Sequence, residues 1–453
     1  MNVLRTGLLW GLLIYAAMGF SQEYPGEHWK KYTHPEDAGF STGQLEQARA
    51  QFEANGGAAL LAVYKGRVVA EWGQVNRRFR QASIRKSYLS ALIGIYAEKG
   101  NIDLNKTLAG LGIDDVTPLT ETERQARVID LLSARSGIYL PSAYMPRGME
   151  ANLPERGSHA PGEFWYYNNW DFNTLATIFM QETGKDLFEA FKTHFAVPLQ
   201  MEDFRMSDTY YRYEKDKSEH PAYLFRLSAR DMARFGYLFL NKGRWKDRQL
   251  VPADWVKKST GIVTRDLGPL FSNKGSYGLL WWISRDIGGS PMFYASGAGG
   301  QRICVFPEDD LVVVHLVDTY QNHNVPEESV QELLGMILKA RVGEPASEPQ
   351  LETLSPPANP GPMMTLPRGK TAVYLGEYLH PFLGTMTVQQ RGDQLTLGTN
   401  IGEFNLYPRS ENTFLIEDMN FNVEFEKGDG DQKRQVKTTM NEKREILKAI
   451  MYY

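Results

Sequence analysis

Two residues, Ser83 and Lys86, have the types and the spacing that nucleophilic catalysis needs. A serine hydroxyl is a weak nucleophile until a nearby base takes its proton, and a lysine can supply or relay that base. Apolar residues then recur at three- and four-residue steps until Lys99-Gly100. This pattern predicts a helix that begins near Ser83 and carries Lys86 one turn later on the same face. The alternative is an ordinary surface helix, because a motif this short also arises by chance.

A second candidate is Tyr167, which stands two residues before Asn169 at the start of another helical pattern. A lysine ammonium close to a phenol lowers the phenol pKa, so Tyr167 could act as a base toward the serine and as an acid toward a leaving group. Asn169 could donate to a substrate carbonyl and also hold the lysine. The competing interpretation is an aromatic loop under the core, since the neighbours are Trp165, Tyr166 and Trp170.

The third candidate is the run Ala295-Ser296-Gly297-Ala298, which ends a predicted strand and precedes Gly299-Gly300. Small side chains let a substrate lie against a strand edge, and a free backbone N–H there could complete an oxyanion hole with the N–H of Ser83. A plain glycine-rich turn is the alternative. The run is neither a phosphate loop nor a dinucleotide fingerprint, because no Gly-Lys-Ser/Thr follows and a strand comes after it.

In this order, Ser83-Ile84-Arg85-Lys86, Tyr167-Asn168-Asn169 and a Ser-Gly strand edge resemble one serine hydrolase family. That family contains class C β-lactamases, low-molecular-weight penicillin-binding proteins, esterases and 6-aminohexanoate-dimer hydrolases. The resemblance covers about residues 35–340, and its flanks at 130–137, 161–162 and 227–236 strengthen it. It implies Ser83 as the nucleophile, Lys86 as its activating partner, Tyr167 as general base and acid, Asn169 as a substrate-positioning donor, and the N–H groups of Ser83 and Ala298 as the oxyanion hole.

The chain departs from this family at Ala295, where many relatives have Lys or His. A cation there helps to bind a substrate carboxylate, so its loss disfavours β-lactamase or D,D-peptidase activity. Arg302 could compensate, or it could be a solvated strand residue. With Trp281 upstream, the third motif looks closest to the 6-aminohexanoate-dimer hydrolase and esterase branch. We therefore expect substrate contacts from Trp281, Ala295, Ser296, Gly297 and Ala298.

The elements around these motifs predict an α/β (α+β) fold, in which an antiparallel sheet is flanked by helices and an all-helical region is inserted. A β-lactamase/transpeptidase-like arrangement is what the resemblance implies. Periodicity predicts helices at 41–55, 125–133, 172–183, 228–241 and 327–340, a hairpin over 58–72, and strands at 276–283, 292–296, 302–306 and 311–317.

Changes in composition along the chain predict four segments. Residues 1–21 read as a signal peptide, because Arg5 precedes an apolar stretch, Leu8–Ala17, that is too short to span a bilayer. Residues 22–344 form the hydrolase-like domain. Seven prolines lie between Pro345 and Pro367, so residues 345–367 predict an extended linker. Short alternating runs in residues 368–453 predict a small β-barrel-like domain.

The composition limits the classes of ligand that the protein is expected to bind. The net charge is −4 and no basic cluster is interleaved with aromatics, which disfavours nucleic acid. Cys304 is the only cysteine and the eight histidines are scattered, so we expect no intramolecular disulfide, no metal and no cofactor. We expect a small-molecule ester, amide or peptide as the substrate, a periplasmic or secreted location, and no stable membrane insertion after signal cleavage.

Three functions remain open at this point. The first is an exported serine hydrolase that cleaves an ester or amide through an acyl-Ser83 intermediate. The second is a penicillin-binding D,D-carboxypeptidase or β-lactamase with the same fold. The third is a catalytically silent cell-envelope binding protein whose C-terminal domain does the recognising. The presence of Ser83, Lys86 and Tyr167 together favours a catalyst over the third possibility.

Overall fold

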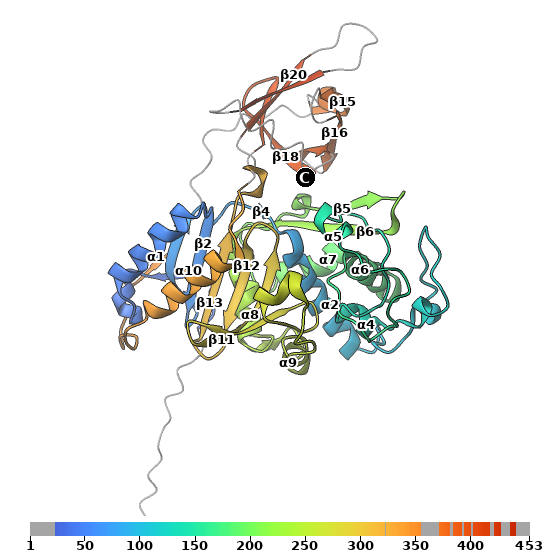
Figure 1. The fold of residues 1–453 in the computed structure, drawn as a ribbon. Helices are drawn as coiled ribbons and strands as arrows, with labels where there is room; N and C mark the ends of the chain where they lie inside the picture. Colours follow the sequence, from blue (N-terminus) through green and yellow to red (C-terminus); the bar gives the residue numbers. More distant parts are fainter. Residues whose placement is uncertain are drawn as a thin grey trace, which may run out of the picture.

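The structure is a computed structural model and describes residues 23–321, 323–354, 371–380, 384–391, 394–399, 402–416, 421–426 and 435–440. The predicted signal peptide and the second half of the predicted linker lie outside these residues. Within them, a larger domain that combines a sheet with helices precedes a smaller all-β domain (Figure 1).

A nine-stranded sheet organises the larger domain, in the order β14-β1-β3-β2-β13-β12-β11-β10-β9. Its central strands β2 (Ala59–Tyr64), β13 (Leu311–Leu316), β12 (Gln301–Phe306) and β11 (Ser290–Gly297) pair antiparallel. The hairpin from β2 to β3 (Arg67–Gly73) was predicted from its two apolar runs. Because β2, β12 and β13 are buried along their whole length, helices must cover both faces of the sheet centre.

Terminal helices cover one face and a middle helix covers the other. On one side, α1 (Thr42–Ala54) and α10 (Glu327–Lys339) pack together, and Phe52 of α1 meets His315 of β13. On the other side lies α8 (Ala229–Leu240), where a Cβ at Gly236 would lie 2.7 Å from Cγ1 of Val312. Residues 312 and 315 of one strand point to opposite faces, so the sheet is sandwiched between these helices.

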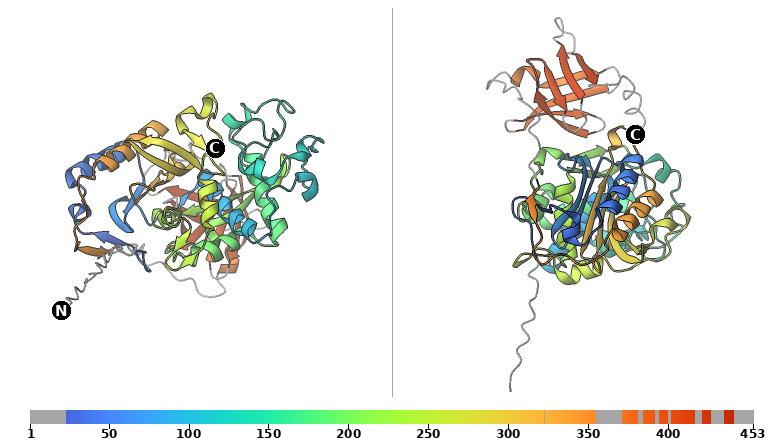
Figure 2. Two further views of the ribbon diagram at one scale, coloured as in Figure 1. Left: turned by 90° about the horizontal axis from the view of Figure 1, so that it is seen from below. Right: turned by 90° about the vertical axis from the view of Figure 1, so that its left-hand side faces the viewer.

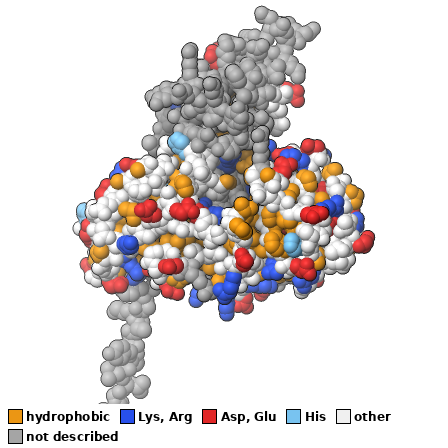
Figure 3. All heavy atoms as spheres, viewed as in Figure 1, with side chains coloured by type: hydrophobic (Ala, Val, Ile, Leu, Met, Phe, Trp, Pro, Cys, Tyr) orange, Lys and Arg blue, Asp and Glu red, His pale blue; other side chains and the backbone are white. Residues whose placement is uncertain are grey.

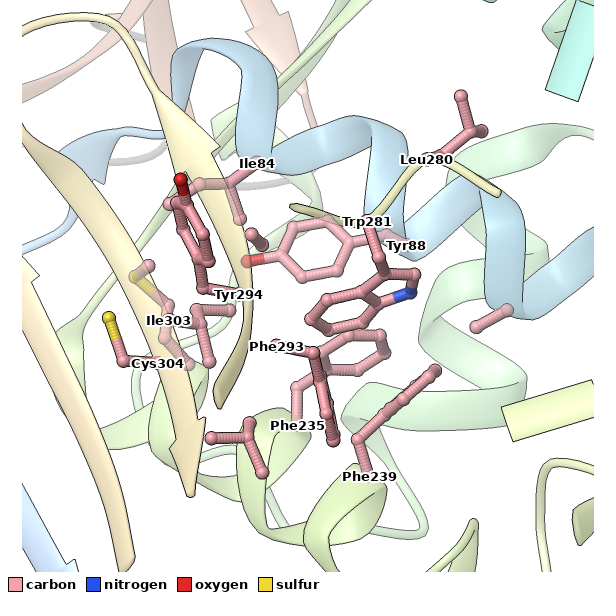
Figure 4. Close-up of a cluster of buried hydrophobic side chains, with 14 of the residues drawn as sticks. Ile84, Tyr88, Phe235, Phe239, Leu280, Trp281, Phe293, Tyr294, Ile303 and Cys304 are labelled. Atoms are coloured by element: carbon pink, nitrogen blue, oxygen red, sulfur yellow. The ribbon is translucent and has the colours of Figure 1, made fainter. Parts of the chain in front are cut away.

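A helical region is inserted beside the sheet, as the sequence predicts. It contains α2 (Arg85–Glu98), α4 (Val128–Leu132), α6 (Asn169–Thr183) and α7 (Leu187–Phe191). Within α2, every residue from Arg85 to Tyr96 is buried, so this helix lies in the core between the sheet and the helical region. Figure 4 shows the aromatic cluster that α2 and α8 form with the sheet.

The C-terminal domain is a closed barrel with its own hydrophobic core. Its strands are β15 (Gly376–His380), β16 (Gly384–Arg391), β17 (Gln394–Thr399), β18 (Gly402–Pro408), β19 (Thr413–Ile416), β20 (Phe421–Glu426) and β21 (Gln435–Met440). Figure 2 shows the barrel beyond one end of the larger domain. Tyr320 of the larger domain joins the barrel core, with its ring 5.7 Å from that of Phe404. The predicted fold class is confirmed, whereas the proposed domain boundaries stay predictions.

Two local predictions needed revision. The predicted strand 276–283 is interrupted: β9 (Ser276–Tyr277) and β10 (Trp282–Ile287) flank a bend. The hydroxyls of Ser87 and Ser90 donate to the carbonyls of Leu280 and Leu279, both at 2.8 Å, which fixes this bend against α2. At the start of the predicted linker, β14 (Leu351–Thr353) pairs with β1 (Lys30–Tyr32) at the sheet edge.

Acidic and basic side chains are interspersed over the face shown in Figure 3, which agrees with the small net charge. None of the helices in the described part of the chain has both the length and the apolar character that crossing a membrane requires.

Candidate active site

Ser83 lies in a short 3-10 turn, η2 (Ala82–Ile84), immediately before α2. Its side chain is partly exposed although its neighbours are buried. Ala82 has a φ of 47°, a left-handed conformation that costs energy for a residue with a Cβ and is concentrated at functional sites. The Gln81 side chain holds the turn in place, since its Nε2 donates to the carbonyls of Phe79 and Leu227.

Lys86 is the partner that the spacing predicts. Its Nζ lies 2.7 Å from Ser83 Oγ, and its side chain is almost fully buried. Among the described residues no carboxylate pairs with this lysine. Burial, and then the nearby charge of Arg85, hold the pKa of Lys86 well below its usual value. A buried amine without a counter-ion favours the neutral form, which can accept a proton.

Tyr167 lies near the nucleophile, because the Ser83 hydroxyl is one of the groups that influence its pKa. Burial raises the pKa of Tyr167 to about 12, and Ser83 and the charge of Arg85 offset this only in part. The expectation that a lysine ammonium lowers this pKa is therefore wrong. Lys86 sits against the ring face instead, with Nζ 4.9 Å from the ring centroids of both Tyr167 and Phe172.

Aromatic side chains explain the desolvation of Tyr167. Its ring lies 4.9 Å from Phe172, 5.3 Å from Trp282 and 5.6 Å from Phe271. Phe271 comes from η6 (Pro269–Lys274), an irregular segment between α9 (Ala253–Ser259) and β9. Sequence analysis missed η6, because so short a segment has no periodicity to detect.

Asn169 begins α6, whose N-cap Asn168 accepts from the backbone N–H of Trp170 at 3.1 Å. Its Nδ2 donates to the carbonyl of Tyr144 at 2.8 Å. Its Oδ1 is buried and has no partner among the described residues. The amide is thus held by the protein rather than by Lys86, which differs from the expectation that Asn169 holds the lysine. Its role toward a substrate stays a prediction.

The edge of β11 comes close to the nucleophile turn at Gly297. A Cβ at this position would lie 2.5 Å from the carbonyl oxygen of Gln81 and 3.3 Å from Cβ of Ala82. Glycine is therefore required for this close approach. Ser296 is largely buried and Ala298 is exposed in the following turn. The structure thus brings the third motif beside Ser83, as predicted.

Two predicted contact residues do not reach the surface of the site. Ala295 is fully buried, because it alternates with Ser296 along the strand. Trp281 is also fully buried, and its ring packs 4.6 Å from Phe239 and 5.4 Å from Phe293 in the core (Figure 4). The next residue, Trp282, faces Tyr167 instead. The burial of Trp281 contradicts its predicted contact with the substrate, and the bend before β10 is what turns this side chain into the core.

A cation that sequence analysis missed stands beside the third motif. Lys274, the last residue of η6, has its Nζ 3.4 Å from Ser296 Oγ and 5.3 Å from the ring centroid of Trp282. Lys274 and Arg302 both pair with Glu327 of α10. Arg302 is buried rather than solvated, and it donates to the carbonyls of Gly297 and Gln301.

No group of three or more His, Cys, Asp or Glu side chains is arranged for a metal ion within the described ranges. The groups that the structure brings together are the Ser83 hydroxyl, the Lys86 amine and the Tyr167 side chain. This set can transfer protons to and from a serine nucleophile.

The beta-lactamase family model matches residues 44–334, which is more than half of the chain. The chain belongs to the beta-lactamase family. The resemblance predicted from the three motifs is thereby confirmed, and it supports a hydrolase with an acyl-enzyme mechanism in general.

Solved structures share the fold. A "putative 6-aminohexanoate-dimer hydrolase" from Bacillus anthracis is 23% identical with a TM-score of 0.51, over 64% of this chain and 80% of that one. An octameric penicillin-binding protein homologue from Pyrococcus abyssi is 18% identical with a TM-score of 0.50, over 87% of this chain and 99% of that one. Such low identities establish a fold and not a substrate. No curated protein matches the chain.

Proposed function

We propose that this protein is an exported serine hydrolase that cleaves an ester or amide bond through an acyl-Ser83 intermediate. The observation that carries the proposal is the 2.7 Å contact between Lys86 Nζ and Ser83 Oγ, made by a buried lysine without a carboxylate partner in the described structure. Because burial favours the neutral form of such an amine, it can take the serine proton directly.

Acylation begins when Ser83 Oγ attacks the substrate carbonyl carbon and its proton passes to Lys86 Nζ. The oxyanion accepts hydrogen bonds from the backbone N–H groups of Ser83 and Ala298. The bond from the carbonyl carbon to the leaving oxygen or nitrogen then breaks. Tyr167, a neutral phenol, gives its proton to the leaving group and regains one from the Lys86 ammonium.

Deacylation repeats these steps with water. Lys86, neutral again, accepts a proton from the attacking water as the water oxygen bonds to the acyl carbon. When the ester bond to Ser83 breaks, the Lys86 ammonium returns that proton to Oγ. The products are a carboxylic acid and the free enzyme.

The experiment is a panel of p-nitrophenyl esters, short amides and a chromogenic β-lactam, tested with wild type and Ser83→Ala. A fluorophosphonate probe measures the labelling of Ser83 in parallel. We expect turnover of an ester or amide and labelling of wild type alone. Equal labelling of Ser83→Ala, or none of either protein, would favour the silent binding protein. Turnover of the β-lactam above all other substrates would favour the penicillin-binding alternative.

Export is a separate part of the proposal and rests on residues 1–21. The small residues Gly19 and Ser21 precede Gln22 at the spacing of a signal-peptidase site. We expect the mature protein to begin at Gln22 and to be recovered from the periplasm or the medium. N-terminal sequencing of the fractionated protein measures this, and an intact Met1 on cell-associated protein would contradict it.

A further inference from the structure

Lys274 belongs to none of the three catalytic motifs, yet it lies beside one of them. Its Nζ contacts Ser296 Oγ at 3.4 Å, and Tyr294 of the same strand donates to its backbone carbonyl at 2.9 Å. Both contacts anchor the end of η6 to β11. The lysine therefore has a defined place at the strand edge.

Lys274 shares its carboxylate partner with a second cation, since Lys274 and Arg302 both pair with Glu327. The neighbouring Glu328 also acts on Lys274, but it is exposed and accepts a hydrogen bond from Asn273 instead of pairing with the lysine. The side chain of Lys274 is 19% exposed, against 4% for Arg302 and 7% for Glu327. The ammonium has three donors, and Glu327 and Ser296 engage two of them. The remaining donor thus belongs to the most accessible of these three side chains.

The ring of Trp282 lies between Lys274 and Tyr167, the proposed acid. The Trp282 ring lies 5.3 Å from Lys274 Nζ and 5.3 Å from the Tyr167 ring. Phe271, three residues before Lys274, packs on both rings. Ser296 precedes Gly297, which touches the nucleophile turn. Neighbouring residues of β11 therefore contact the nucleophile turn and Lys274.

We propose that Lys274 is a specificity-determining residue that binds a carboxylate carried by the substrate, so that this hydrolase prefers anionic esters or amides. The inference rests on the hydrolase function proposed above. It replaces the expectation that Ala295 leaves the site without a cation: the charge is supplied from another segment of the chain. A partly buried ammonium held by a serine and a carboxylate binds a second carboxylate through a charge-assisted hydrogen bond.

The protonation of Lys274 gives this preference a pH limit. Burial, and then Arg302, lower the pKa of Lys274 to about 8, although Glu327 and Glu328 act in the opposite direction. Below this value the ammonium is present and can bind an anion. As the pH rises through about 8 the charge is lost, and the preference for anionic substrates should be lost with it.

The test compares each anionic substrate with a neutral partner of similar shape. Glutaric acid mono-p-nitrophenyl ester against p-nitrophenyl pentanoate places the carboxylate on the acyl side. 3-Acetoxybenzoate against its methyl ester places it on the leaving group. We expect wild type to prefer the anionic member of at least one pair by roughly 10- to 100-fold in kcat/KM, mainly through KM.

Variants then assign that preference to the lysine. Lys274→Met should lower the ratio of anionic to neutral kcat/KM to about one, and Lys274→Arg should keep most of the ratio and extend it to higher pH. Lys106→Met, which removes a lysine paired with Glu182 away from the site, is the matched control and should keep the wild-type ratio. An unchanged ratio in Lys274→Met, or no preference in wild type, would overturn the inference.

Binding to Ser83→Ala separates this inference from the proposed function. Calorimetric titration with both members of each substrate pair needs no turnover. Tighter binding of the anion in at least one pair, lost when Lys274→Met is added, would support the inference even if wild type proved inactive. Equal binding within both pairs would overturn it even if wild type proved to be an active esterase.

Discussion

Two lysines each touch a serine hydroxyl in this molecule: Lys86 is buried, Lys274 is partly buried, and their surroundings differ. Lys86 contacts Ser83 at 2.7 Å and has aromatic rings for neighbours. Lys274 contacts Ser296 at 3.4 Å and has Glu327 as a counter-ion. Burial holds the pKa of Lys86 well below its usual value, and the pKa of Lys274 is lowered to about 8.

In the mechanism proposed here, the presence or absence of a counter-ion decides the role of each amine. Burial alone destabilises the ammonium, so the amine becomes a proton acceptor. Burial beside a carboxylate preserves the ammonium near neutral pH, so the amine binds anions instead. Lysine thus serves in two proposed roles: Lys86 as the base and Lys274 as the cation that binds an anion. The two lysine–serine pairs are also connected through aromatic rings. Tyr167, which lies beside Lys86, packs on Trp282, which lies beside Lys274.

The largest expected effect is from Lys86→Met. Loss of the base should lower kcat/KM by roughly 10²- to 10⁴-fold for anionic and neutral substrates alike. Removing a buried amine without a counter-ion should leave the thermal midpoint equal or higher. Steady-state kinetics and thermal unfolding measure the two effects, with Lys99→Met at the end of the same helix as the control. Activity within about threefold of wild type would remove Lys86 from the mechanism.

Arginine substitutions should separate the two lysines most clearly. Lys86→Arg should be about as inactive as Lys86→Met, because a guanidinium stays protonated and cannot accept the serine proton. Lys274→Arg should retain activity, because an anion binder needs only the charge. If Lys86→Arg kept near-full activity, the assignment of Lys86 as a base would be wrong.

Tyr167→Phe should have a smaller effect that depends on the leaving group. With a pKa of about 12 the phenol acts as an acid, so alkyl esters and amides should lose roughly 100-fold and p-nitrophenyl esters much less. The ratio of rates for p-nitrophenyl and ethyl esters of one acid measures this. Phe172→Leu, which alters the same aromatic wall, is the control. Equal losses for both esters would exclude leaving-group protonation by Tyr167.

The smallest effect concerns Glu327→Gln. Burial and Arg302 lower the pKa of Lys274, whereas the Glu327 carboxylate raises it. Without this carboxylate, the pKa of Lys274 should therefore fall below about 8. The preference for anionic substrates should then disappear at a lower pH than in wild type. Neutral esters, assayed over the same pH range, serve as the internal control. A midpoint that stayed in place would show that Glu327 does not set the charge of Lys274.

Local patterns predicted much of this architecture. The spacing of Ser83 and Lys86 within one helical turn, the small residues of β11 and the hairpin β2–β3 all depend on neighbours in sequence. Their positions therefore followed from periodicity. The family resemblance added the order of the motifs, which local patterns alone do not decide.

The remaining features depend on tertiary contacts. Lys274 reaches Ser296 from an irregular segment, so no motif spacing could reveal it. The direction of the Tyr167 pKa shift required knowledge of the rings that bury it. The choice between Trp281 and Trp282 depended on a bend that Ser87 and Ser90 fix from another element.

The central claim is that Lys86 is a neutral amine at the pH of catalysis. Its most direct test is an NMR titration of protein labelled with ¹³C at lysine Cε, with the Lys86 signal assigned by its absence from Lys86→Met. The account predicts a titration midpoint well below the usual lysine value of 10.5, coincident with the rising limb of kcat/KM for a neutral ester. A Lys86 that remains protonated at a pH where the enzyme is fully active would contradict it.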